Sequence, residues 1–186
     1  MNKYLDWAKR EYSLKRRLIA LSFAGVFFLL LFPYLLVTSS TAIDRWLHLP
    51  KFVGGAINPI VGLILILKGF LLGFWSNYAQ MTIGRGTPLP VMPTVKLVVQ
   101  GPFVYCRNPM TLGTFIAYSG VGVWLGSISA LAIVLILISL LLCYIKLLEE
   151  KELEARYGAE YLEYKRKTPF ILPNIRAMID KVAKLE

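Results

Sequence analysis

No aspartate or glutamate lies between positions 45 and 148, although the 186 residues include 11 acids. Six of those acids fall within positions 149–163. A water-soluble domain would spread its acids over its surface, and about 25% of its residues would be charged, against 17% in this chain. With 56% hydrophobic residues, the chain is also too apolar to be disordered. The sequence therefore predicts a membrane protein, and its length predicts a single domain over residues 1–186.

The net charge, the two cysteines and the single histidine limit which partners and metals the protein can be expected to bind. A net charge of +10 would suit nucleic acid, but here basic residues flank apolar runs, as in proteins that bind an anionic membrane surface. We therefore expect the lipid bilayer as a partner, and no nucleic acid. Two distant cysteines, Cys106 and Cys143, and one histidine, His48, match no metal-binding or disulfide pattern. We expect no metal.

Four apolar stretches are long enough to cross a bilayer, whose hydrocarbon core of ~30 Å needs about 20 residues of helix. The first exceeds the ~7–15 residues of a signal-peptide core, which favours an uncleaved anchor. The uncharged run at 108–145 is too long for one span, and the glycines and serines near its middle predict a turn. Asn108 suits a helix N-cap and Pro109 a first helical position. The sequence predicts an all-α integral membrane protein with four spans at about 18–37, 53–77, 108–125 and 129–148.

The last two of these spans are predicted to form a helical hairpin. The distribution of Lys and Arg along the chain predicts which side of the membrane each segment faces. The first 17 residues carry six basic residues and the tail from Lys151 carries eight, whereas the loop after the first span has only Arg45 and Lys51. Both termini are therefore expected in the cytoplasm, at a bacterial inner membrane or a eukaryotic endoplasmic reticulum. Segments 83–109 and 146–173 then share the cytoplasmic side.

Residues 175–185 have the spacing of an interfacial amphipathic helix, with a solvated tail as the alternative.

The first cytoplasmic segment contains residue types that suit a ligand. Gly84 and Gly86 would let a ligand approach the backbone closely. Arg107, Asn108 and Pro109 place a cation and an amide at the start of a helix, where backbone N–H groups can hold an anionic group. The alternative is a plain turn followed by an ordinary helix cap, with the arginine near lipid phosphates.

The second segment begins with Glu149 and Glu150 at the inner end of the fourth span. Acids at a helix C-terminus are unfavourable unless the helix continues or a cation is bound. Continuation would end at Gly158, which suits a C-cap. Paired carboxylates would also suit hydroxyl groups or a positively charged ligand. The tyrosines that follow at spacings of four and three, expected along a pocket wall or at the membrane interface, are Tyr157, Tyr161 and Tyr164.

Lys68 is the one charge inside the second predicted span. A charge in a span is a candidate functional group by default. Its place toward the cytoplasmic half favours an ammonium that reaches outward to the interface, over a contact with a substrate or lipid phosphate.

The two segments together resemble the isoprenylcysteine carboxyl methyltransferase and phospholipid methyltransferase superfamily. The resemblance rests on Gly-Pro-Phe-x-Tyr-x-Arg-Asn-Pro-Met at 101–110, an apolar stretch of hairpin length, and Glu-Glu-x-x-Leu-x-x-x-Tyr-Gly-x-x-Tyr-x-x-Tyr-Lys at 149–165. It extends from about residue 83 to residue 173. The first two spans match only in hydrophobicity.

The resemblance implies a membrane enzyme that transfers a methyl group from S-adenosylmethionine to a lipophilic acceptor: a prenylcysteine carboxylate, a phospholipid amine, or a small thiol or amine. The apolar hairpin and the second span are expected to admit the acceptor from the side. The catalytic residues it implies are Arg107, Asn108 and Glu150, with Tyr105 and Glu149 as further candidate bases. The cofactor-binding residues it implies are Gly84, Gly86, Lys96, Leu97, Val98, Phe103, Asn108, Pro109, Glu149 and Glu150.

The chain departs from the family pattern at three positions. Asn108 stands where histidine is common, and Thr111 stands where tyrosine is frequent. Phe170 lies near a position that is often basic, which argues against a carboxylate acceptor. Two other functions stay open from the residues alone: an NADPH-dependent membrane reductase of similar architecture, and a non-catalytic transporter or assembly protein.

Overall fold

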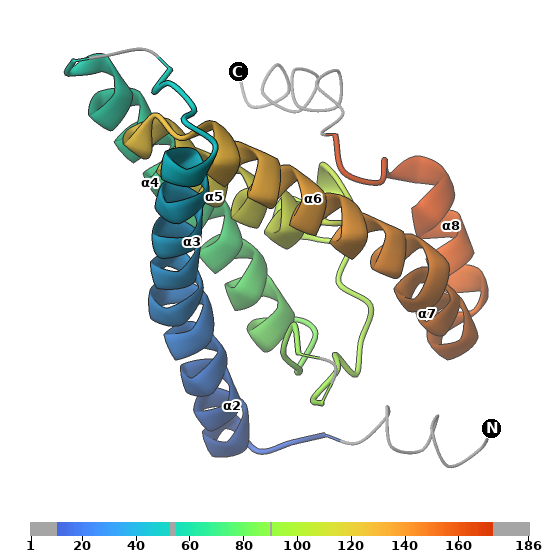
Figure 1. The fold of residues 1–186 in the computed structure, drawn as a ribbon. Coiled ribbons are helices and arrows are strands. Elements are labelled where there is room, and N and C mark those ends of the chain that lie inside the picture. Colours follow the sequence, from blue (N-terminus) through green and yellow to red (C-terminus); the bar gives the residue numbers. More distant parts are fainter. Residues whose placement is uncertain (1–10, 53–54, 90, 173–186) are drawn as a thin grey trace, which may run out of the picture.

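The computed structural model describes residues 11–52, 55–89 and 91–172, and the regular structure within them is helical throughout. Figure 1 shows one long helix along the side of the molecule, two helices that pack against each other, and a last long helix that crosses the front. The amphipathic helix predicted at 175–185 lies outside the described residues.

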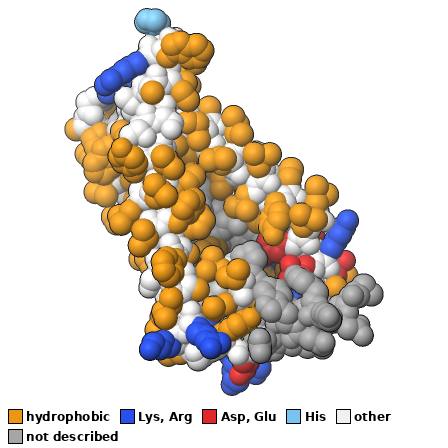
Figure 2. Space-filling view, turned by 60° about the horizontal axis from the view of Figure 1, so that its bottom comes forward, with side chains coloured by type: hydrophobic (Ala, Val, Ile, Leu, Met, Phe, Trp, Pro, Cys, Tyr) orange, Lys and Arg blue, Asp and Glu red, His pale blue; other side chains and the backbone are white. Residues whose placement is uncertain are grey.

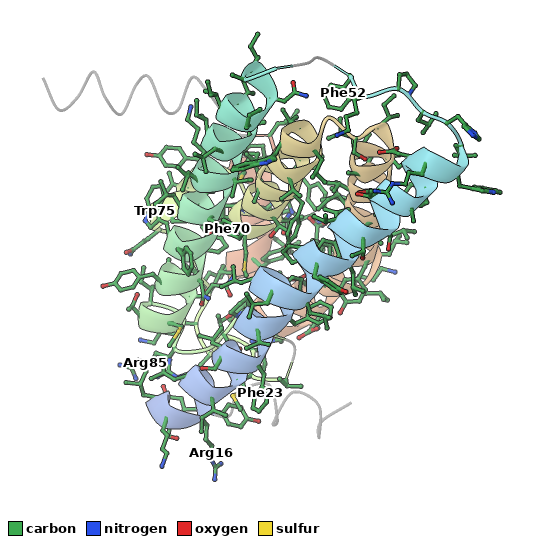
Figure 3. The ribbon with its side chains drawn as sticks, turned by 60° about the vertical axis from the view of Figure 1, so that its left-hand side comes forward. Arg16, Phe23, Phe52, Phe70, Trp75 and Arg85 are labelled. Carbon is green, nitrogen blue, oxygen red and sulfur yellow. The ribbon has the colours of Figure 1, made fainter. Side chains whose placement is uncertain are left out.

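The first helix runs without interruption from Leu14 to Trp46. It consists of α2 (Leu14–Val26), a π-helical turn (Phe27–Leu31) and α3 (Phe32–Trp46). It is longer than the predicted span at 18–37, because its ends extend beyond the apolar stretch to charged residues. At its start, Arg17 donates a hydrogen bond of 2.9 Å to the carbonyl of Met81, at the end of the next helix. In Figure 3, Arg16 and Arg85 lie at this end of the molecule and Phe52 at the other.

The helices α4 (Ile57–Thr82) and α5 (Pro109–Leu125) touch backbone to backbone along a line of glycines. A Cβ atom added at Gly62 would lie 2.7 Å from the backbone nitrogen of Trp124, and one added at Gly69 would lie 2.4 Å from that of Ala117. Such small residues allow the close packing that holds helices together in lipid, where no hydrophobic effect drives them into contact. The seam between α4 and α5 is therefore closed.

A turn of two residues joins α5 to α6 (Ile128–Tyr144), as the length of the uncharged run predicts. Gly126 adopts a φ of +62°, which favours glycine, and Ser127 caps α6 by accepting a hydrogen bond from the backbone of Ala130. Asp44 from the first helix accepts hydrogen bonds from the Ser127 hydroxyl (2.5 Å) and the Ser129 backbone (3.1 Å). This carboxylate ties the first helix to the hairpin, at a helix N-terminus where negative charge is favourable.

The helix begun by α6 continues through a π-helical turn (Ile145–Glu149) into α7 (Glu150–Tyr157). Gly158 ends it with a φ of +55°, as the sequence predicts, and α8 (Ala159–Lys167) follows. The acids Glu149 and Glu150 therefore lie inside a continuing helix and not at its end.

Three helices of the described residues are long and apolar enough to cross a membrane: Leu14–Trp46, Ile57–Thr82 and Ile128–Tyr157. Their outward side chains are largely exposed hydrophobics, which cover the face drawn in Figure 2. The protein is thus an integral membrane protein. The 17 residues of α5 extend about 25 Å, less than the ~30 Å core. The count of four spans and the cytoplasmic orientation of the termini stay predictions.

The glycine seam predicts opposite effects of one substitution at two positions of α4. Gly69→Ala places a methyl group against the α5 backbone and should destabilise the fold by about 1–3 kcal/mol. A Cβ at Gly73 meets nothing within 4 Å, so Gly73→Ala should leave stability unchanged or raise it by up to about 1 kcal/mol through helix propensity. Thermal unfolding in the same detergent compares the two. Equal effects of both substitutions would show that the seam does not hold the helices together.

Candidate active site

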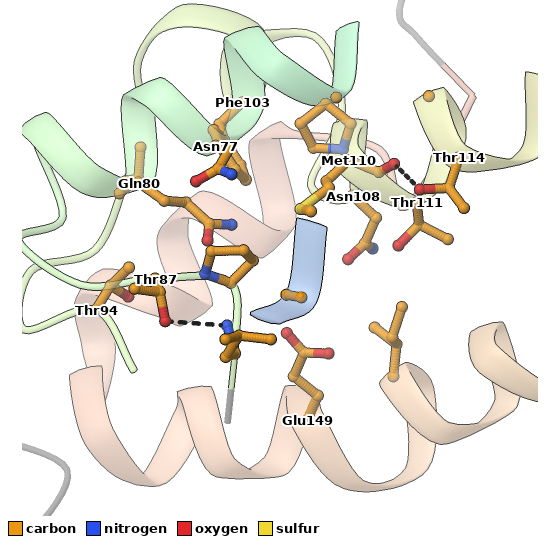
Figure 4. A pocket seen from close by; sticks show the side chains of 18 of the residues that line it. Asn77, Gln80, Thr87, Thr94, Phe103, Asn108, Met110, Thr111, Thr114 and Glu149 are labelled. Carbon is orange, nitrogen blue, oxygen red and sulfur yellow. Dashed lines mark hydrogen bonds between the residues drawn. The ribbon is translucent and has the colours of Figure 1, made fainter. Parts of the chain in front are cut away.

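A cavity of about 700 Å³ lies between the first helix, α4, the loop that joins α4 to α5, α5 itself, the helix formed by α6 and α7, and α8. Its volume is within the ~300–1,000 Å³ of ligand pockets. Figure 4 shows polar side chains of the lining, among them Asn77, Asn108 and Glu149, and the first helix and α6 add mostly apolar residues to the lining. The cavity is therefore a candidate site for a ligand with an apolar and a polar part.

The loop after α4 folds back on itself, and its two predicted glycines make that fold possible. A Cβ at Gly84 would lie 2.7 Å from the Thr94 methyl group, and one at Gly86 would lie 2.4 Å from the Thr94 Cα atom. Both glycines lie behind the cavity wall and do not line it, and the side chain of Lys96 is exposed. Of the predicted run 96–98, Leu97 and Val98 line the cavity.

Tyrosines of the last two helices hold this loop in place. The Tyr157 hydroxyl donates a hydrogen bond of 2.6 Å to the carbonyl of Thr94, and the Tyr164 hydroxyl donates one of 2.7 Å to the carbonyl of Phe103. Phe103 and Tyr161 are buried, and both line the cavity together with the half-buried Tyr164. Burial raises the pKa of Tyr161 and of Tyr164 above the usual value, so both hydroxyls stay protonated donors at neutral pH.

Arg107 and Asn108 are anchored to the segment that follows α8. The Arg107 backbone donates to the carbonyl of Pro169, and the Asn108 side chain donates to that of Phe170, both at 2.9 Å. Asn108 is the N-cap of α5 by position, as expected, but its side chain forms no capping bond. The Arg107 guanidinium lies 5.5 Å from the centre of the Phe170 ring. The Phe170 ring therefore lies against two cations, Arg107 and Lys146.

Glu150 is the centre of a buried ion cluster. Its side chain is 3% exposed and forms ion pairs with Arg107, with Lys146 at 3.2 Å and with Lys165 at 3.0 Å. Hydrogen bonds to Glu154 and to Glu150 raise the pKa of Lys165 above its ordinary value. A raised lysine pKa means that the ion pairs of Lys165 contribute fully at neutral pH and are lost only as pH rises above about 10.5. Because it pairs with Arg107, the buried Glu150 carboxylate also positions that guanidinium group at the start of α5.

Glu149, the neighbouring acid, is in a different situation. Its half-buried side chain points into the cavity, and it forms no hydrogen bond or ion pair within the described part of the chain (Figure 4). Of the two predicted carboxylates, Glu149 is the one with oxygens available to a ligand.

Two parts of the cavity were not anticipated from the sequence. The first helix supplies apolar wall residues, among them Leu21 and Phe28, and α4 supplies the amides of Asn77 and Gln80. A signal for the amides exists: two polar residues at a spacing of three, at the end of an apolar span. Pro109 also lines the cavity, whereas Lys68 is exposed away from it.

The positions of the two acids predict different effects of one substitution. Glu150→Gln leaves Arg107 without its buried partner and should destabilise the fold by about 3–5 kcal/mol. Glu149→Gln removes an unpaired charge and should leave stability unchanged or raise it. Thermal unfolding of the two purified variants at neutral pH makes the comparison. A Glu149→Gln variant that is as unstable as Glu150→Gln would contradict the assignment.

Comparison with known protein families places this chain. The family model described as phospholipid methyltransferase matches residues 57–160, which is more than half of the chain. The matched region begins with α4, includes the loop and the hairpin, and ends in α8. Neither curated proteins nor solved structures give a match.

Proposed function

Because the chain belongs to the phospholipid methyltransferase family, we propose that it uses S-adenosylmethionine to methylate a lipophilic acceptor at the cytoplasmic face of the membrane. Membership of the family makes the chain a membrane methyltransferase. The methyl donor, the acceptor and the site residues belong to the proposal.

The observation that carries the proposal is the unpaired Glu149 carboxylate inside the cavity. S-adenosylmethionine has ribose hydroxyls, an amino group and a positive sulfonium, all of which suit a carboxylate without another partner. Leu97, Val98 and Phe103 line the same cavity and offer an apolar wall to the rest of the molecule. The carboxylate and the apolar residues of the cavity therefore suit this cofactor.

When bound, S-adenosylmethionine supplies an electrophilic methyl group that passes directly to a nucleophile. The task of the chain is then to align the two reactants and exclude water, and orientation alone can lower such a barrier by ~7–11 kcal/mol. Arg107, held by Glu150, and Asn108, held by the Phe170 carbonyl, form a rigid polar end to the cavity.

The acceptor enters, in this proposal, between the first helix and α6. The glycine seam leaves no route between α4 and α5. Leu21 and Phe28 of the first helix and Leu141 of α6 line the cavity from opposite sides. Figure 2 shows a hollow flanked by hydrophobic side chains on this face.

Calorimetry with S-adenosylmethionine tests the proposal. The protein in detergent should bind it, and Glu149→Gln should weaken binding at least about tenfold, because a lost hydrogen bond to a charged group is worth ~1.5–3 kcal/mol. Glu163→Gln is the matched control, since Glu163 is exposed and pairs with Lys167 outside the cavity. Transfer of a radiolabelled methyl group from S-adenosylmethionine to a component of a lipid extract then identifies the acceptor.

Two results would contradict the proposal. One is an absence of S-adenosylmethionine binding by the intact protein. The other is a rise in the melting temperature with NADPH and none with S-adenosylmethionine, which would favour the reductase.

A further inference from the structure

Four basic residues gather at the end of the molecule where the first helix starts. Three follow one another in the first turn of α2 and the fourth lies in the loop after α4, and together we call them the basic patch: Lys15, Arg16, Arg17 and Arg85. Two contacts bring their segments together. Arg17 donates a hydrogen bond of 2.9 Å to the Met81 carbonyl, and Arg85 forms an ion pair of 3.1 Å with Glu11. Figure 3 shows Arg16 and Arg85 at this same end.

The protein's own acids do not neutralise the basic patch. Glu11 is the one acid paired with it in the part of the chain that the structure describes. Both side chains of that pair are more than half exposed, and an ion pair in water is weak. Lys15 and Arg16 are exposed and form no ion pair within the described residues. Positive charge is also unfavourable in the first turn of a helix, so α2 gains no stability from these side chains. The patch therefore has positive charge available for a partner outside the protein.

Arg85 has a left-handed backbone, which is uncommon for a residue with a side chain. Its φ is +53°, whereas neither of its glycine neighbours, Gly84 and Gly86, has a positive φ. Glycine would adopt this conformation without strain. The loop thus places a cation where its backbone favours glycine, and such strain often accompanies a functional side chain.

The basic patch lies beside the apolar surface that faces lipid. The exposed hydrophobic side chains of the first helix resume at Leu18, directly after Arg17, and those of α4 include Phe74 and Tyr78 in the two turns before Met81. Both helices are long and apolar enough to cross a membrane. The four basic residues do not line the cavity. An anion at the patch therefore lies at the level of the lipid headgroups and outside the acceptor site.

We propose that the basic patch binds the phosphate group of an anionic lipid, whose acyl chains lie along the exposed apolar residues of α2 and α4. Guanidinium groups bind phosphate with paired hydrogen bonds, which makes Arg16 and Arg85 the principal contacts. The lipid links the start of the first helix to the loop after α4, next to the hydrogen bond from Arg17. Because α2 has no buried residue, this link helps to hold it in place. The inference goes beyond the proposed function and does not depend on it.

Lipid binding by the full-length protein tests the inference. In detergent, native mass spectrometry should show tighter binding of phosphatidylglycerol than of phosphatidylcholine with the same chains, and phosphatidylglycerol should raise the melting temperature. Arg16→Gln combined with Arg85→Gln should weaken phosphatidylglycerol binding roughly 30-fold, since each basic residue near an anionic lipid surface contributes about fivefold. Arg45→Gln combined with Lys51→Gln is the matched control. It removes two exposed cations from the opposite end of the first helix and should not change this binding.

Arg85→Gly keeps the test decisive if the double variant does not fold. Glycine relieves the backbone strain, so this variant should be at least as stable as the unaltered protein in phosphatidylcholine, yet bind phosphatidylglycerol about fivefold more weakly. Equal affinities of the unaltered protein for the two lipids would overturn the inference, as would an equal loss of phosphatidylglycerol binding in the control.

Glycerol phosphate, which carries the anionic group without acyl chains, separates a lipid from a free phosphate. It should leave the melting temperature unchanged. A rise as large as that caused by phosphatidylglycerol would overturn the assignment to a lipid. None of these measurements involves S-adenosylmethionine, so a failure of the proposed function and a failure of this inference are distinguishable.

Discussion

The site depends on the ion pairs formed by the buried carboxylate of Glu150. It joins Arg107 at the start of α5, Lys146 in the π-helical turn after α6, and Lys165 in α8, so one side chain connects segments distant in the sequence. A buried ion pair is costly to assemble, and removal of one partner leaves an uncompensated charge. The cluster therefore holds the polar end of the cavity in one arrangement, and it leaves the adjacent Glu149 without a partner.

A second set of contacts shapes the remaining walls. Hydrogen bonds from Tyr157 and Tyr164 hold the loop after α4 against the last helices, and the glycine seam closes the opposite side. Arg17 and Asp44 fasten the first helix at its two ends, which keeps its apolar face along the cavity. π-helical turns often mark functional sites, and the two here both contribute cavity residues, including Phe28 and Glu149.

Much of the fold followed from local pattern. The uncharged run at 108–145 required a turn, and the structure has it at Gly126 and Ser127; the continuation of the last helix to Gly158 was likewise foreseeable. The site was harder to predict from the sequence. Leu97, Val98, Phe103 and Pro109, whose role in cofactor binding stays a prediction, line the cavity, whereas Gly84 and Gly86 support the loop from behind. Asn77 and Gln80 lie in the second span, which the sequence motifs matched only in hydrophobicity; that expectation was wrong, because the family match begins at residue 57.

The sequence by itself determined that the chain is a helical membrane protein with a hairpin, because apolar length, turn residues and the absence of acids are properties of neighbouring positions. It also marked Glu149 and Glu150 as a pair. Only the tertiary structure decided which of them is free, because that depends on where Arg107 and Lys165 lie in space. The seam between α4 and α5 and the apolar wall from the first helix were decided in the same way, since each arises from packing between distant segments.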